Sequence, residues 1–276
     1  MEDKILFLGD SFTWGEGLEL FIENEKWIKQ RELHSEWLQL EVIQDVESIK
    51  FREKNRYPRL VGDELNIIPI TEFKNGGSFG TNLKFVKDVK IPDLTCIFVQ
   101  LSQLGRNPLH LTYGCRCSYC TKTHWESIET IYNDILEKKE SNGLRYMLDV
   151  FGHNEVDNEF LRKFLLFIKW HDRYITELFI EECKKWEQTT PVYFIDSWSI
   201  DDSDYWRGYS YINDRLINLT KKDETSTKRW STFIESFENP YIVDLWPNTV
   251  NRHPTLEIQQ YLAKSVISHL RENFGY

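Results

Sequence analysis

The chain has 276 residues, a formal net charge of −10, and 41% hydrophobic residues. This length suits one large α/β domain with insertions, and the negative charge argues against a nucleic-acid partner, because proteins that bind the phosphate backbone usually present a basic face. No apolar run approaches the roughly 18 residues of a membrane span, and none resembles a signal peptide. The five cysteines are odd in number and three of them are clustered, which fits a reducing compartment better than a disulfide framework. We therefore expect a cytoplasmic protein.

Strands and helices are expected to alternate along the chain. Five strands are predicted, at residues 5–8, 70–75, 94–101, 191–198 and 241–246, of which the first and third are continuous apolar runs. Apolar residues at helical spacing predict helices at residues 57–66, 156–187 and 255–272. This alternation is typical of a parallel, doubly wound sheet.

Two segments are too long to be simple connections. Residues 19–56 are rich in Glu, Lys, Gln and Trp and lack Gly and Pro, which predicts a helical insertion. Residues 105–190 exceed the length of one crossover and predict an insertion subdomain, because long structureless loops are rare in compact domains. We expect residues 1–276 to form a single domain with these two insertions.

Ser11 follows the first predicted strand through Gly9 and Asp10. It is therefore expected at the carboxyl edge of the sheet, where open α/β sheets bind ligands. A simpler interpretation is that Asp10 and Ser11 cap a helix. Acyl transfer by a serine needs a base, a group that orients the base, and N–H donors for the oxyanion. His253, between the last predicted strand and the last helix, falls on the same edge, and so does Gly80, whose N–H with that of Ser11 would form the oxyanion hole.

Three stretches carry a family resemblance: "GDSFTWG" at 9–15, "GGSFGTN" at 76–82 and "RHPT" at 252–255. With them, the chain resembles the SGNH hydrolases, also called GDSL esterases and lipases. The resemblance implies Ser11 as nucleophile, His253 as base and Gly80 as oxyanion donor. It also implies a three-layer α/β/α fold, with a flavodoxin-like parallel sheet of five strands in the order 2-1-3-4-5 and helical insertions.

The sequence departs from the family pattern before the histidine. The family usually places an Asp two or three residues earlier, and Asn251 and Val250 stand there instead. Asn251 can accept the imidazole N–H and is our first candidate for the orienting group, although it cannot offset an imidazolium charge. Asp244 is the second candidate, and its alternative is a plain residue at the end of a strand.

A second departure lies after the third predicted strand. The family commonly has Gly-x-Asn-Asp in this region, whereas the chain reads "QLSQLGRN" at 100–107. Candidate donors are present there, and Trp14 lies close to the nucleophile. We expect substrate contacts from Asp10, Trp14, Asn82, Gln103, Arg106 and Asn107.

A cysteine cluster lies within the second insertion. Cys115, Cys117, Cys120 and His124 form a Cys-x-Cys-x₂-Cys-x₃-His array. Four such ligands suit tetrahedral Zn²⁺ in a closed structural site, and a region without its own core can be folded by a metal. The alternative is a group of free thiols beside an unrelated histidine. No catalytic cofactor is expected.

These features predict a serine esterase that cleaves an acyl or acetyl ester through an acyl-enzyme. The substrate would be a small-molecule or carbohydrate ester. One alternative is an O-acyltransferase that uses the same site, in which an alcohol rather than water resolves the intermediate. The other is a binding or structural protein that kept the fold and lost activity, which the missing Asp and third-block Asn permit.

Overall fold

The computed structural model describes residues 3–32, 45–73, 79–80, 82–83, 91–101, 108–111, 124–139, 141–197, 206, 208–249 and 252–276. At its centre lies a sheet of parallel strands in the order β2-β1-β3-β6. These strands are β1 (Lys4–Gly9), β2 (Ile68–Phe73), β3 (Leu94–Gln100) and β6 (Val192–Ile195). In chain order this is 2-1-3-4, which confirms the parallel sheet and its predicted order over four strands.

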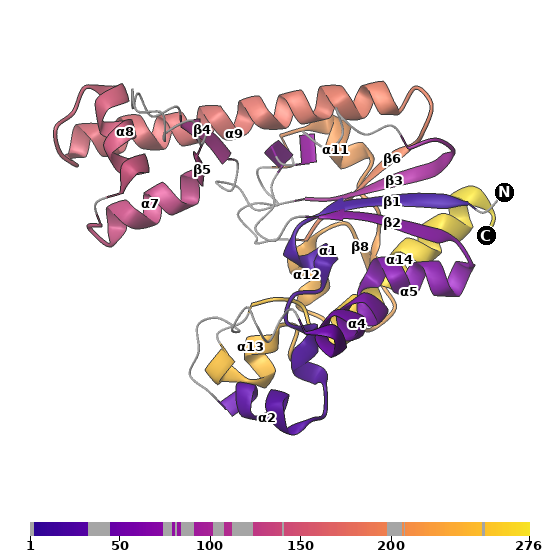
Figure 1. The fold of residues 1–276 in the computed structure, drawn as a ribbon. Coiled ribbons are helices and arrows are strands. Elements are labelled where there is room, and N and C mark those ends of the chain that lie inside the picture. Colours follow the sequence, from indigo (N-terminus) through magenta and orange to yellow (C-terminus); the bar gives the residue numbers. More distant parts are fainter. Residues whose placement is uncertain are drawn as a thin grey trace.

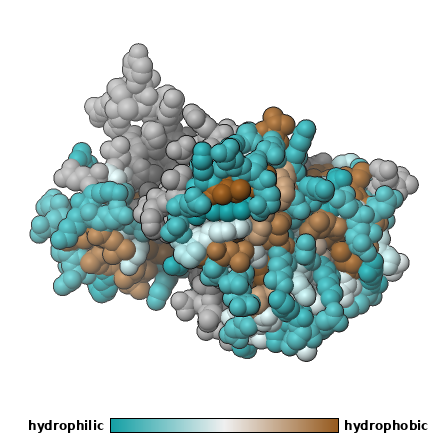
Figure 2. Space-filling view, turned by 90° about the horizontal axis from the view of Figure 1, so that it is seen from below, coloured by the Kyte–Doolittle hydropathy of each residue, from teal (hydrophilic) through white to brown (hydrophobic). Residues whose placement is uncertain are grey.

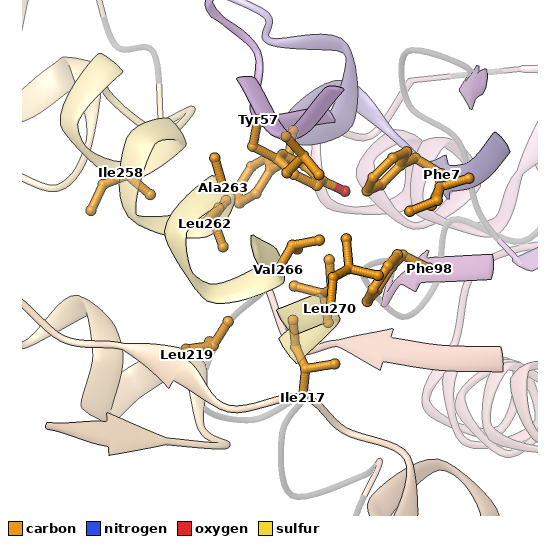
Figure 3. Close-up of a cluster of buried hydrophobic side chains, with 14 of the residues drawn as sticks. Phe7, Tyr57, Phe98, Ile217, Leu219, Ile258, Leu262, Ala263, Val266 and Leu270 are labelled. Atoms are coloured by element: carbon orange, nitrogen blue, oxygen red, sulfur yellow. The ribbon is translucent and has the colours of Figure 1, made fainter. Parts of the chain in front are cut away.

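One face of the sheet packs against two helices, α5 (Tyr57–Leu65) and α14 (Leu256–Phe274). Because side chains alternate along a strand, Ile5 and Phe7 of β1 point to this face and Leu6 and Leu8 to the other. Phe7 stacks on Phe98 of β3, with ring centroids 5.5 Å apart. Figure 3 shows these rings beside α14, on the side of the helix that carries Val266 and Leu270.

The other face is covered by α9 (Asn158–Trp186), whose second half contributes Phe179, Ile180 and Cys183 to a second buried cluster. Helix α11 (Ser210–Asp214) adds Ile212 to it. With α9 on one side and α5 and α14 on the other, the molecule has the expected three α/β/α layers (Figure 1).

The first half of α9 extends away from the sheet and forms an arm (Figure 1). There it packs with α7 (Ile128–Leu136) and α8 (Asn142–Phe151) around a separate apolar cluster that includes Phe160 and Phe164. The arm therefore has a small core of its own, within the region where an insertion subdomain is expected.

The predicted fifth strand at 241–246 is wrong. Residues Ile242–Leu245 form a short helix, α13. Its Asp244 carboxylate accepts a hydrogen bond from the backbone N–H of Tyr241, 2.8 Å away, which caps the helix. Ile242 is buried in a cluster with Trp27, outside the central sheet. Among the described residues, the central sheet thus has four strands.

The segment predicted as a helical insertion contains η1 (Leu18–Phe21), α2 (Glu25–Glu32) and α4 (Val46–Asn55). The predicted helices at 57–66, 156–187 and 255–272 are present as α5, α9 and α14. The remaining short elements are α1 (Ser11–Trp14), β4 (Pro108–Leu111), β5 (His124–Ser127), β7 (Leu219–Thr220), β8 (Ser226–Thr227), α12 (Trp230–Ile234) and η2 (Pro247–Thr249).

No helix in the described part of the chain is both long enough and apolar enough to cross a membrane. On the face seen in Figure 2, hydrophilic side chains surround smaller apolar areas.

Candidate active site

The first feature of the site is the turn that holds Ser11 at the carboxyl end of β1. Ser11 is the first residue of α1, and Asp10 is its N-cap. One Asp10 carboxylate oxygen accepts hydrogen bonds from the backbone N–H of Phe12 and from Nε2 of Gln100, both at 3.0 Å. Asp10 is fully buried, and Ser11 is 1% exposed. The capping function considered for Asp10 is therefore present, and it holds Ser11 at the sheet edge.

Gly9 is required by close packing beneath this turn. A side chain at position 9 would overlap Oγ1 of Thr13, which donates a hydrogen bond to Oε1 of Gln100. The same Thr13 hydroxyl lies 3.3 Å from the Tyr57 hydroxyl. Gly9 thus allows the turn to approach a buried polar network.

His253 is held by backbone contacts with residues 240–242, which lead into α13. The N–H of Ile242 donates to the His253 carbonyl, and the N–H of Thr255 donates to the Pro240 carbonyl, both at 3.0 Å. An isolated antiparallel bridge pairs Tyr241 with Pro254. These contacts fix the loop that carries His253 just before α14 begins.

The imidazole ring of His253 also contacts α1, the helix that carries Ser11. It meets the Phe12 ring edge to face, with centroids 5.6 Å apart. Gln259 of α14 donates a hydrogen bond to the Phe12 carbonyl at 3.1 Å and accepts one from the N–H of Tyr57 at 2.9 Å. Gln259 thereby links α14 to α1, which carries Ser11, and to α5.

Ser11 and His253 are in hydrogen-bond contact. Oγ of Ser11 lies 2.8 Å from Nε2 of His253, although 242 residues separate them in the sequence. This is the distance over which an imidazole can take the proton of an attacking hydroxyl.

A third side chain reaches the same imidazole nitrogen. Oε2 of Glu16 lies 3.4 Å from Nε2 of His253, and the Glu16 side chain is 7% exposed. Glu16 sits between Gly15 and Gly17, both of which have positive φ, and its N–H donates to the Ser11 carbonyl at 3.0 Å. The two left-handed glycines turn the chain back toward Ser11.

Sequence analysis missed Glu16. The available signal was a charged residue placed between two glycines, five residues after the predicted nucleophile. That pattern predicts a turn, but not which side chain the turn approaches.

Of the two residues considered for orienting His253, the structure describes only Asp244. Asp244 is engaged at the N-terminus of α13, where it accepts from the Tyr241 N–H. It is thus the plain structural residue that we gave as its alternative, at a helix start rather than a strand end. Asn251 lies outside the described residues.

The other predicted contact residues are only partly described. Gly80 is half-buried and follows Phe79, whose ring stacks on Phe179 of α9 with centroids 4.6 Å apart. Asn82 is buried, at 3% exposure. The backbone of Trp14 closes α1. Gln103, Arg106 and Asn107 lie outside the described residues, and the oxyanion and substrate contacts stay predictions.

The proposed zinc ligands are also largely outside the described part of the chain. This applies to Cys115, Cys117 and Cys120, whereas the backbone of His124 lies in β5, paired with that of Leu111. Within the described residues, no group of three or more His, Cys, Asp or Glu side chains is arranged to hold a metal ion. Two other cysteines, Cys96 and Cys183, are buried free thiols.

No protein-family model matches the sequence, and neither does any curated protein. The fold is similar to that of a carbohydrate esterase, with 12% identity and a TM-score of 0.46 over 99% of this chain and 69% of the other. It is also similar to a lipolytic protein of the G-D-S-L family from Desulfitobacterium hafniense, with 10% identity and a TM-score of 0.38 over 95% and 98% of the two chains. An esterase from Pseudoalteromonas shares 12% identity at a TM-score of 0.40, over 98% and 100%. Because these TM-scores are all below 0.5, we infer the function from the geometry of the site and not from these similarities.

Proposed function

We propose that the protein is a serine esterase of the SGNH type that cleaves an acyl or acetyl ester through an acyl-enzyme. The observation that carries this proposal is the 2.8 Å contact between Ser11 Oγ and His253 Nε2 at the carboxyl edge of the parallel sheet. A buried hydroxyl in contact with an imidazole, beside the start of a helix, is the arrangement that nucleophilic catalysis requires.

In the first half-reaction, Ser11 Oγ forms a bond to the ester carbonyl carbon while its proton passes to His253 Nε2. Backbone N–H groups of Ser11 and Gly80 would stabilise the negative charge on the carbonyl oxygen. When the C–O bond to the alcohol breaks, His253 returns the proton to the leaving oxygen. Water then attacks the acyl-enzyme with His253 again as base, which releases the acid and restores Ser11.

A fluorophosphonate probe and a short-chain aryl ester test this proposal. Wild-type protein is expected to be labelled and to hydrolyse the ester, whereas Ser11→Ala and His253→Ala lose both activities with an unchanged circular dichroism spectrum. Ser197→Ala is a matched control, since Ser197 is a buried serine just after β6 that donates to the Leu101 carbonyl at 2.9 Å. It should be labelled like the wild type.

The same experiment addresses the two alternatives. Absence of labelling in folded wild-type protein would reject the enzyme and favour a binding protein with this fold. Labelling with poor hydrolysis, but with ester formation when a sugar or another alcohol is supplied, would identify an O-acyltransferase.

The zinc site and the cytoplasmic location also remain proposals. The spacing of Cys115, Cys117, Cys120 and His124 supports one structural Zn²⁺ per chain. Metal analysis of protein purified without chelator should find about one zinc per chain, and chelation should lower its stability. Native protein without metal would reject the site.

A further inference from the structure

The turn after Ser11 brings a carboxylate to the atom that would accept the Ser11 proton. Nε2 of His253 lies 2.8 Å from Ser11 Oγ and 3.4 Å from Glu16 Oε2. A carboxylate in a serine-histidine site ordinarily contacts the opposite nitrogen, Nδ1. Here the carboxylate and the hydroxyl share one nitrogen.

Glu16 differs from the next glutamate along the same segment. Glu19 is also buried, but it pairs with the guanidinium of Arg52 at 3.1 Å. A guanidinium group keeps its positive charge, whereas an imidazole can gain and lose a proton. The interaction of Glu16 therefore changes strength with the protonation state of His253, while that of Glu19 has a constant partner.

Burial strengthens the electrostatic interaction between the Glu16 carboxylate and the His253 ring. The side chains of Glu16 and His253 are 7% and 18% exposed, so that solvent screens their charges only weakly. Among the charged residues of the described chain, Glu16 lies beside the ring and Arg252 precedes His253 in the sequence. Asp10 caps α1 next to Ser11, and Asp244 caps α13 next to the segment that binds the His253 backbone. The Glu19–Arg52 pair follows the turn. Ser11 and Phe12 of α1 contact the ring without carrying charge.

We propose that Glu16 is a positioning residue whose carboxylate stabilises the protonated form of His253 through Nε2, in place of the Asp that the sequence lacks before His253. This inference rests on the proposed function.

The proton balance of the reaction explains when Glu16 acts. With neutral His253, the Ser11 hydroxyl donates to the Nε2 lone pair. When Oγ bonds to the carbonyl carbon, its proton moves to Nε2, and the new N–H of the imidazolium lies beside the Glu16 carboxylate. The proton then passes to the leaving oxygen, and the interaction weakens again. Glu16 thus favours the intermediate over the resting state, which is the condition for accelerating the reaction.

The test compares Glu16→Gln, Glu16→Asp and Glu19→Gln. Glu16→Gln is expected to lower kcat by about ten- to a thousandfold, the range of a neighbouring charge, while KM stays near that of the wild type because Glu16 acts through His253. Glu16→Asp should recover part of the loss. Glu19→Gln makes the same change three residues away. It removes the partner of the buried Arg52 and should therefore lower stability, but it should leave kcat unchanged when each variant is assayed under conditions in which it is fully folded. A normal kcat in Glu16→Gln would overturn the proposal.

An NMR titration of the His253 ring separates this proposal from the proposed function. The protonation midpoint of His253 should fall by at least about one pH unit in Glu16→Gln and change little in Glu19→Gln. An unchanged midpoint in Glu16→Gln would overturn the role of Glu16, even in an active enzyme. Failure of wild-type protein to react with the fluorophosphonate would instead reject the esterase and leave the midpoint to decide the Glu16 contact. If Glu16→Gln does not fold, the midpoint in Glu16→Asp decides.

Discussion

Ser11 and His253 are held by different kinds of contact. The Ser11 side depends on buried polar side chains: Asp10 accepts from Gln100, and Gln100 accepts from Thr13. The His253 side depends on backbone hydrogen bonds with the 240–242 segment and on the ring of Phe12.

This difference predicts how each side responds to substitution. A buried side-chain network loses stability when one member is removed, because its partners keep unsatisfied polar atoms in a dry environment. Backbone bonds survive most side-chain changes. We therefore expect the Ser11 side to be sensitive in folding stability and the His253 side to be more tolerant away from His253 itself.

The largest effect is expected from Arg52→Met, which leaves the buried Glu19 carboxylate at the end of the Ser11 turn without its cation. Removal of one partner of a buried pair costs about 3–5 kcal/mol. Denaturant titrations at pH 8 measure the loss. A decrease of less than about 1 kcal/mol, as at a surface pair, would show that the turn does not depend on this contact.

The pH dependence of the same pair gives a second, smaller effect. Burial raises the pKa of Glu19 to about 6, although Arg52 acts in the opposite direction. The folded state therefore favours the neutral carboxyl, so the stability from this group is fully present below the ordinary pKa near 4.5 and is lost as the pH rises through about 6. The deficit of Arg52→Met should accordingly shrink at pH 5, where Glu19 can bind a proton. An equal deficit at both pH values would contradict this origin.

Gly9→Ala should destabilise the Ser11 side by about 1–3 kcal/mol, because the added Cβ overlaps Thr13 and disturbs its bond to Gln100. Urea titration measures the change, and ester hydrolysis should fall with the displaced turn. Gly152→Ala is a control glycine substitution, since nothing lies within 4 Å of a Cβ there; any loss at Gly152 reports its positive φ of 72° rather than overlap. Normal hydrolysis in Gly9→Ala would show that the turn tolerates the overlap.

The smallest effect is expected from Asp244→Ala on the His253 side. Loss of the cap of α13 should lower stability by about 0.5–2 kcal/mol, while kcat/KM stays close to that of the wild type because Asp244 binds the Tyr241 N–H. A loss of several powers of ten in kcat/KM would mean that Asp244 orients His253 after all.

Much of the fold could be predicted from local pattern. The apolar runs of β1 and β3 are long enough to identify buried strands, and the helical spacing of α14 predicts its apolar face. The segment 241–246 shows where this reasoning stops. A short apolar run satisfies either a strand or a helix. Only Tyr241 forms an extended bridge, with Pro254, and the helix begins directly after it, where Asp244 accepts from the Tyr241 N–H and Ile242 is buried beside Trp27.

The sequence by itself determined the parallel sheet and the Gly-Asp-Ser turn at its edge, because strand burial and turn chemistry are properties of neighbouring residues. The sequence also predicted Ser11 and His253 at one edge of the sheet, but only the tertiary structure decided that Glu16 joins them. The contacts of His253 with Ser11 and Glu16 bridge more than 230 residues of chain, and they exist because α14 packs on the same sheet whose first strand ends in the nucleophile turn. The side chain that a glycine-flanked Glu16 meets depends on that packing, and no local pattern specifies it.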